Sequence, residues 1–273
     1  MEWVLLVMIG LAAGSLGALI GLGGGIIIVP ALLYFSNYTS WLGPISPQVA
    51  VGTSLVIMIF TGLSSTLAYM KHKTVDYRSG LLFFLGSGPG AILGAWVNQY
   101  LNMESFNIYF GIFIIFISLV LMFRDKLKPI TFSKKGIERH FQDAAGNTYN
   151  YSLQPILAVG IAFLVGFTSG LFGIGGGSLM VPAMILLFLF PPHVAVATSM
   201  FMILLSALVS SFTHVLLGNV NWLYSLALIP GAYVGAKLGA FLNKKLKSDS
   251  LVSVLRIILI VIGVRLIYQG FMG

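Results

Sequence analysis

The sequence contains no cysteine and very few charged residues. Without cysteine, the chain has no disulfide bond, no thiolate metal site and no thiol nucleophile. Only 8% of its 273 residues are charged, whereas a soluble domain carries roughly a quarter. Hydrophobic residues make up 58% of the chain, and apolar runs of about 20 residues, enough to cross a bilayer, recur along it. The composition therefore predicts a polytopic membrane protein.

Signatures of catalysis and of metal binding are missing as well. The sequence has no HExxH motif, no paired carboxylates and no nucleophile–base pair, and the glycine-rich GLGGG is not followed by the Lys-Ser or Lys-Thr of a phosphate-binding loop. None of the seven acidic residues falls in the middle of an expected span, which argues against a cation pump built on a buried carboxylate. We expect no enzyme activity, no cofactor and no metal, and an intramembrane enzyme is the least favoured alternative.

The net charge of +8 does not indicate nucleic-acid binding. The loop cations cluster in short segments beside apolar runs, where they set orientation and contact anionic lipid headgroups. Membrane lipid is therefore an expected partner, nucleic acid is not, and a homo-oligomer stays open. The first residues, MEWVLLVMIG, lack the basic start and the cleavage site of a signal peptide, so they are expected to form a retained helix.

Apolar segments are arranged in two groups of five. They cover residues 3–22, 25–36, 48–70, 79–99 and 105–123, and then 154–174, 177–190, 193–216, 222–242 and 250–270. The intervening polar stretch contains six Lys or Arg residues, and its Gly146-Asn147 pair suggests a turn or hairpin. We expect a first membrane repeat (1–123), a cytoplasmic linker (124–153) and a second membrane repeat (154–273).

Three motifs occur twice in the same order, which indicates an internal repeat. GLGGGIIIVP (21–30) matches GIGGGSLMVP (173–182) at six of ten places. VAVGTS (49–54) matches VAVATS (194–199), and PGAILGA (89–95) matches PGAYVGA (230–236). The PGA motifs are expected to kink or thin their helices for close crossing.

Loop cations indicate that the two repeats are inverted relative to each other. Lys71, Lys73 and Arg78 follow the third segment of the first half, whereas Lys244, Lys245 and Lys247 follow the fourth segment of the second half. If each glycine-rich segment is a hairpin followed by three crossings, all twelve loop cations are cytoplasmic and the N-terminus is outside. The alternative is eight simple spans in parallel repeats, which forces the 244–247 cluster outside.

Short apolar arms follow the glycine motifs. Residues 26–36 would form a helix of about 16 Å, too short for a hydrocarbon core of about 30 Å. A helix that begins there directs its positive N-terminal end at whatever lies in the turn, which suits an anion. Two such ends would form the midplane site of a secondary transporter. The alternative role of these glycines is close helix packing. The candidate glycines are Gly23, Gly24, Gly25, Gly175, Gly176 and Gly177.

Hydroxyl residues near the motifs are further candidates. Thr53, Ser54, Thr198 and Ser199 are able to donate hydrogen bonds to the same cavity, or to bond helix backbone instead. Ser178 replaces Ile26 of the first half and is a candidate for substrate discrimination.

Two further positions break the internal symmetry. Lys237 replaces Trp96, and its ammonium group either faces the anion or extends to the membrane surface. His214 replaces Tyr69 and is expected to be a polar cap, or less readily a proton carrier.

The duplicated GLGGGIIIVP and GIGGGSLMVP, each followed by GTS or ATS and then PGAxxGA, resemble the sulfite exporter TauE/SafE family. The resemblance implies a bacterial-type inner-membrane permease for small anions such as sulfite, sulfoacetate and other organosulfonates. It also implies that the glycine turns and the Thr-Ser pairs bind the substrate. The leading hypothesis is therefore a secondary transporter that works by alternating access, with a passive anion channel as the alternative. Exact substrate, direction and coupling ion are left open.

Overall fold

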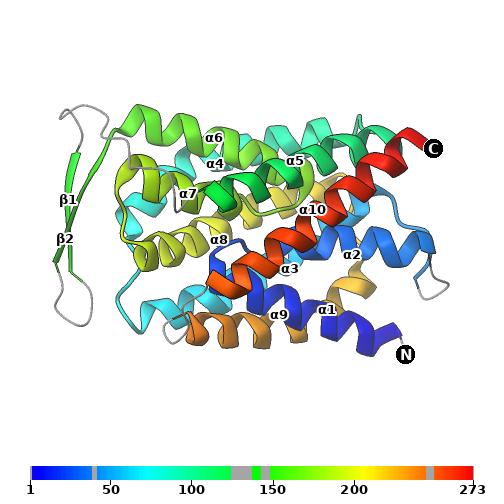
Figure 1. The fold of residues 1–273 in the computed structure, drawn as a ribbon, viewed down its shortest axis with the longest axis horizontal. Coiled ribbons are helices and arrows are strands. Elements are labelled where there is room, and N and C mark those ends of the chain that lie inside the picture. The colour runs from blue at the N-terminus through cyan, green and yellow to red at the C-terminus, as the bar shows by residue number, and fades with distance from the viewer. Residues whose placement is uncertain (1, 39–41, 124–136, 143–147, 244–248, 273) are drawn as a thin grey trace.

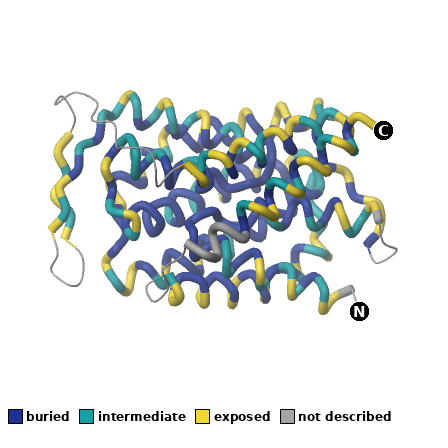
Figure 2. The backbone as a smooth tube through the Cα atoms, in the orientation of Figure 1, coloured by how far each residue is buried: buried dark blue, intermediate teal, exposed yellow. Residues whose placement is uncertain are grey.

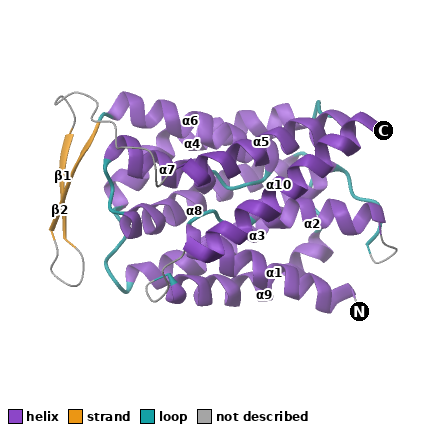
Figure 3. Cartoon of the chain, viewed as in Figure 1, coloured by secondary structure: helices purple, strands orange, loops and turns teal. Residues whose placement is uncertain are grey.

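The computed structural model describes residues 2–38, 42–123, 137–142, 148–243 and 249–272, without the side chains of residues 2, 38 and 249–254 (Figures 1 and 3). The first half contains α1 (Glu2–Ile20), α2 (Gly25–Tyr38), α3 (Pro47–Met70), α4 (Tyr77–Asn98) and α5 (Met103–Phe123). Two strands follow, β1 (Ile137–Gln142) and β2 (Thr148–Leu153). The second half contains α6 (Pro155–Phe172), α7 (Gly177–Phe188), α8 (Pro192–Leu216), α9 (Trp222–Leu242) and α10 (Asp249–Met272).

Eight helices in the described part of the chain are long and apolar enough to cross a membrane, namely α1, α3, α4, α5, α6, α8, α9 and α10. The other two, α2 and α7, have 14 and 12 residues. At 1.5 Å per residue they reach only about 20 Å, less than a hydrocarbon core of about 30 Å. The expected helical, polytopic membrane protein is confirmed, and the short arms are present as separate helices.

The linker departs from the all-α expectation because it contains a β-hairpin. Strands β1 and β2 pair antiparallel, with Ile137 opposite Leu153 and Arg139 opposite Tyr151. Alternating aromatic and polar residues (Phe141, Tyr149, Tyr151) give each strand one side that packs inward, and aromatic residues favour strands. The expected turn at Gly146-Asn147 lies outside the described residues, as do Lys244, Lys245 and Lys247.

The two halves interlock through exchanged helices. Helix α1 of the first half packs along α9 of the second, and α6 of the second packs along α4 of the first. Glycines make these crossings close: a Cβ on Gly235 would lie 2.2 Å from the carbonyl oxygen of Leu11, and one on Gly94 would lie 2.0 Å from that of Phe167. The PGAxxGA motifs therefore allow backbone-to-backbone packing, as small residues do in membranes.

Helices α3 and α8 pack against each other at the centre and are the most buried of the long helices (Figure 2). Helices α5 and α10 form a separate pair beside this centre. Figure 1 shows α2 at the end of the molecule that holds both termini, and α7 at the end that holds the β-hairpin. The two short arms thus extend from the interior toward opposite ends.

Candidate functional site

Two turns rich in glycine interrupt the helices inside the molecule. In the first glycine turn (residues 21–24), Gly21, Gly23 and Gly24 have φ angles of 83°, 84° and 94°. In the second glycine turn (residues 173–176), the three equivalent glycines have φ angles of 70°, 82° and 69°. This left-handed region is accessible to glycine at no steric cost. The repeated motif is therefore a turn between two helices, and the GLGGG spacing places glycine where the backbone needs it.

The two glycine turns meet in the interior. A Cβ on Gly25, the first residue of α2, would lie 1.9 Å from the carbonyl oxygen of Gly173. A Cβ on Gly177, the first residue of α7, would lie 1.9 Å from the carbonyl oxygen of Gly21. The contact is reciprocal, and the residues of both turns are buried. Two helix N-termini, each equivalent to about half a positive charge, therefore begin side by side away from solvent.

Met58 and Ile203 fill the space beside these turns. Each follows the serine of its Thr-Ser motif by four residues, and both side chains are fully buried. A Cβ on Gly175 would lie 1.7 Å from Cε of Met58 and 3.5 Å from Cγ2 of Ile203. A Cβ on Gly23 would lie 2.4 Å and 3.2 Å from the same two atoms. The junction is thus closed by apolar side chains in this conformation.

Both serines of the Thr-Ser motifs bond to the turn of the other half. Oγ of Ser54 lies 2.9 Å from the carbonyl oxygen of Gly173, and Oγ of Ser199 lies 3.1 Å from that of Gly21. Each hydroxyl is also 2.8 Å from a carbonyl oxygen of its own helix, three residues earlier. Because a hydroxyl has a single proton, each serine shares its donor between these two carbonyl oxygens. The bond to the other half holds the glycine turn in place.

The threonines of the same motifs bind the starts of other helices. Oγ1 of Thr53 accepts the backbone N–H of Asn221 at 3.0 Å, and Oγ1 of Thr198 accepts that of Asp76 at 3.0 Å. Asn221 and Asp76 are the N-caps of α9 and α4, with side chains that accept N–H groups of the first turn. All four hydroxyls of the Thr-Ser motifs therefore bond to the backbone of the other half of the chain.

Of the remaining predicted site residues, one lies beside the turns and one does not. Ser178 is buried as the second residue of α7, next to the second glycine turn. Lys237 lies on the exposed side of α9, opposite the glycines that pack on α1. Its ammonium group is therefore not brought together with the turns in this conformation, which is the arrangement expected of a side chain that extends to the membrane surface.

Tyr69 and His214, the pair that differs between the two halves, bond to the helices that lead into the glycine turns. The hydroxyl of Tyr69 donates to the carbonyl oxygen of Ala18 at 2.9 Å, and Nε2 of His214 lies 3.1 Å from that of Gly170. Both side chains are buried. Tyr69 thereby bonds to the end of α1 and His214 to the end of α6, the helices that precede the two glycine turns. The motifs do not single out Met58 and Ile203, although each lies four residues after the serine of its Thr-Ser motif. Two apolar residues in an apolar helix form no distinguishing pattern. Within the described residues, no three His, Asp or Glu side chains form a metal-ligand set.

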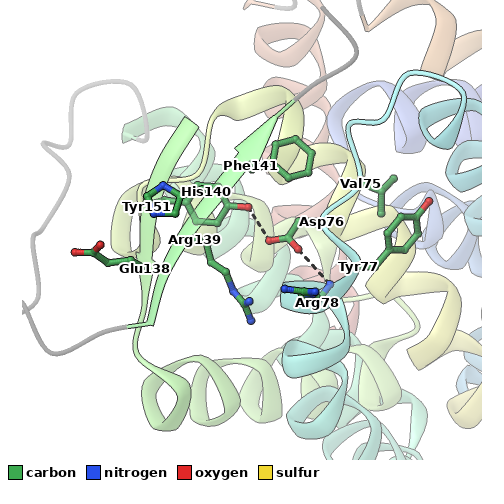
Figure 4. A pocket seen from close by; sticks show the side chains of 9 residues that line it. All are labelled: Val75, Asp76, Tyr77, Arg78, Glu138, Arg139, His140, Phe141 and Tyr151. Carbon is green, nitrogen blue, oxygen red and sulfur yellow. Dashed lines mark hydrogen bonds between the residues drawn. The ribbon is translucent and has the colours of Figure 1, made fainter. Parts of the chain in front are cut away.

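A cavity of about 430 Å³ lies between the β-hairpin and the start of α4 (Figure 4). The hydroxyl of Tyr151 donates to Oδ2 of Asp76 at 2.6 Å, as the dashed line in Figure 4 shows. Burial and this hydrogen bond to a carboxylate raise the pKa of Tyr151 above its usual value. This hydrogen bond fixes the β-hairpin to Asp76, whose backbone N–H donates to Thr198.

Comparison with known proteins identifies the family of the chain. Residues 6–266 match the family described as "Sulfite exporter TauE/SafE". The chain is 60% identical to the probable membrane transporter protein YunE of Bacillus subtilis over 270 residues, which covers 99% of both chains. It is 26% identical to a probable membrane transporter protein of Xylella fastidiosa over 266 residues, 97% of this chain and 93% of the relative.

A probable membrane transporter protein of Methanocaldococcus jannaschii is 27% identical over 269 residues, 95% of this chain and 93% of the relative. No solved structure matches. The match covers both glycine turns, both Thr-Ser motifs and all or most of every long helix. The protein with the paired glycine turns is thus a membrane protein that belongs to the sulfite exporter TauE/SafE family.

Proposed function

We propose that the protein is a secondary transporter that moves a small sulfur-containing anion, such as sulfite, sulfoacetate or another organosulfonate, across the inner membrane by alternating access. The observation that carries the proposal is the reciprocal contact of the turns, with Gly25 against Gly173 and Gly177 against Gly21. It brings two helix N-termini together, and the positive dipole end of a helix favours an anion. The name of the family supports sulfite as a substrate, and the names of the relatives support membrane transport.

The substrate binds between the two turns after the apolar side chains there have moved. An ion in an apolar interior costs tens of kcal/mol by idealised estimates, so the helix ends and Ser178 have to replace its water shell. In the closed arrangement Met58 and Ile203 fill this space. Methionine has three rotatable bonds and adapts its shape readily, so its displacement is the smallest change that admits an anion.

Alternating access follows from an inverted pair of repeats. The exchanged contacts of α1 with α9 and of α6 with α4 support this arrangement, as do the two arms that extend toward opposite ends (Figure 1). In the proposed orientation the β-hairpin end is cytoplasmic and the N-terminus is outside. The described cations Lys71, Lys73 and Arg78 then lie on the cytoplasmic side, as the positive-inside rule requires.

Flux into proteoliposomes tests the proposal. Purified full-length protein is reconstituted, and uptake of labelled sulfite, sulfoacetate and taurine is measured with and without a proton gradient. We expect saturable movement of at least one of these anions. Movement of cations alone would contradict the proposal. Flux that does not saturate at millimolar substrate and ignores the gradient would instead indicate the passive channel, which the closed junction at Met58 disfavours.

A further inference from the structure

A second cavity, distinct from the glycine turns, lies between α2, α5 and α10. Its volume is about 300 Å³, and its wall is largely apolar, with Ile27, Pro30 and Leu33 from α2 and Ile262 and Leu266 from α10. It adjoins an outer cavity of about 520 Å³, because four residues line both. These shared residues are polar: Asn37, Asn107, Arg265 and Gln269. The space therefore has an apolar inner part and a polar collar.

Arg265 provides the positive charge of this collar. It is the sole charged residue among those that line the inner cavity. Its guanidinium carbon lies 4.3 Å from the centre of the Tyr34 ring, a cation–π contact that holds the group over α2. A guanidinium presents five N–H donors in a planar fork and remains charged at every physiological pH. The cavity thus contains a positioned group with the geometry to bind an oxyanion.

Asn107 indicates that this cavity is built for a polar ligand. Its side chain is only 6% exposed, and its Oδ1 atom is buried without a hydrogen-bond partner. A buried polar group left unpaired costs about 1–3 kcal/mol, so native structures rarely retain one without a reason. Asn107 lines both cavities. Oδ1 needs a donor, and a water that donates one hydrogen to Oδ1 and the other to a bound anion would satisfy it.

We propose that this cavity binds a small organic anion, with its sulfonate or carboxylate group on Arg265 and the polar collar and its short apolar tail on the wall from α2 and α10. The volume is at the lower end of the range of ligand pockets, which fits a molecule of a few carbon atoms. A diacyl lipid is too large for it. Glu104 lines only the outer cavity, so no carboxylate lies in the wall of the inner cavity.

The proposal concerns binding and does not require that the protein transports the same molecule. Where the proposed function also holds, the cavity is the outer vestibule of the α2 arm, since Ile27 lies two residues beyond Gly25. The ligand class is then the organosulfonates rather than sulfite itself, because an inorganic anion has no apolar group that would contact the apolar wall.

Calorimetry on the full-length protein in phosphatidylcholine nanodiscs tests the cavity, with butane-1-sulfonate as the probe. We expect one saturable site per chain, with weaker binding of sulfate and of butan-1-ol, which lack the tail and the charge respectively. Arg265→Gln should weaken binding about tenfold or more, and Asn107→Leu about threefold to tenfold. Asn107→Leu removes an unpaired polar group, so this variant should fold at least as well as the parent. Lys71→Gln removes a cation outside this cavity and should leave binding unchanged.

Three outcomes would overturn the proposal. The first is the absence of saturable binding, and the second is binding that neither variant changes. The third is loss of binding in nanodiscs that contain phosphatidylglycerol, with that lipid retained by the parent and released by Arg265→Gln, which would assign the cavity to lipid. Flux of sulfite without binding at this cavity refutes the present inference alone, and binding here without any flux refutes the proposed transport alone.

Discussion

The hydroxyl of Ser54 lies 2.9 Å from the carbonyl oxygen of Gly173, 119 residues further along the chain. Its counterpart Ser199 lies 3.1 Å from the carbonyl oxygen of Gly21. Each half of the protein thus fixes the glycine turn of the other half. The consequence is that the two helix N-termini are held together by contacts between halves, so a relative movement of the halves must change the geometry of the turns.

Removal of these bonds should weaken the junction to a similar extent on both sides. Ser54→Ala and Ser199→Ala are each expected to lower the free energy of unfolding by about 0.5–1.5 kcal/mol. Thr168→Ala is the control, because Oγ1 of Thr168 bonds to Val165 of its own helix and, within the described residues, to nothing in the other half. Thermal unfolding in detergent measures all three. An effect of the control as large as that of the serines would contradict a special role for the contact between halves.

The close approach of the turns makes Gly25 intolerant of any side chain. Gly25→Ala places a methyl group against the carbonyl oxygen of Gly173, a backbone atom that cannot rotate away. We expect lower thermal stability and loss of flux. Gly160→Ala is the control, since a Cβ there meets nothing within 4 Å, and alanine in a helix is favoured over glycine by about 0.5–1 kcal/mol. Normal flux in Gly25→Ala would argue that the turns do not bind substrate.

Met58 should determine how readily the junction opens. Met58→Ala leaves a cavity at a fully buried site and is expected to cost about 2–5 kcal/mol of stability. It should also raise the flux of bulky sulfonates relative to sulfite. Met58→Leu, which nearly conserves volume, should cost less than about 1.5 kcal/mol and retain the parent's selectivity. Equal substrate selectivity in all three proteins would exclude Met58 from the substrate path.

His214 and Tyr69 occupy equivalent positions and bond equivalent carbonyl oxygens. His214→Tyr should therefore retain the tie to Gly170 and fold, whereas His214→Leu leaves that tie unmade and should be less stable by about 1 kcal/mol or more. Flux across a pH series separates this structural role from proton transfer. A pH dependence that disappears in an otherwise active His214→Tyr protein would assign His214 to proton coupling.

Tyr151 should make the docking of the β-hairpin sensitive to high pH. Folding raises its pKa through burial and the bond to Asp76. The unfolded side chain titrates near pH 10. The stabilisation is therefore complete below pH 10 and is lost as the pH rises above it toward the folded-state pKa.

Hydrogen exchange of residues 148–153 between pH 8 and 11, corrected for intrinsic exchange rates, measures this docking. Protection should fall in the parent above pH 10. Tyr151→Phe should begin with lower protection and show less of that decline. The same decline in both proteins would mean that Tyr151 is not the titrating group.

Much of the architecture follows from local patterns in the sequence. Apolar runs of about 20 residues predict spans because a backbone in lipid must satisfy its own hydrogen bonds. Glycines at 21, 23 and 24 and again at 173, 175 and 176 predict turns because positive φ angles favour glycine. The repeat of three motifs predicts two equivalent halves. The Gly146-Asn147 pair indicates a turn or hairpin in the linker, but the bounds and the register of its strands come from the structure.

Only the tertiary structure decides what the motif residues touch. Sequence spacing places Ser54 and Thr53 early in a helix, but it leaves open whether they face a cavity or a backbone atom more than 100 residues away. That choice depends on the exchange of α1 and α6 between the halves, and long-range packing of this kind leaves no local pattern. The same holds for Met58, which is one apolar residue among many until the fold sets it between the two glycine turns.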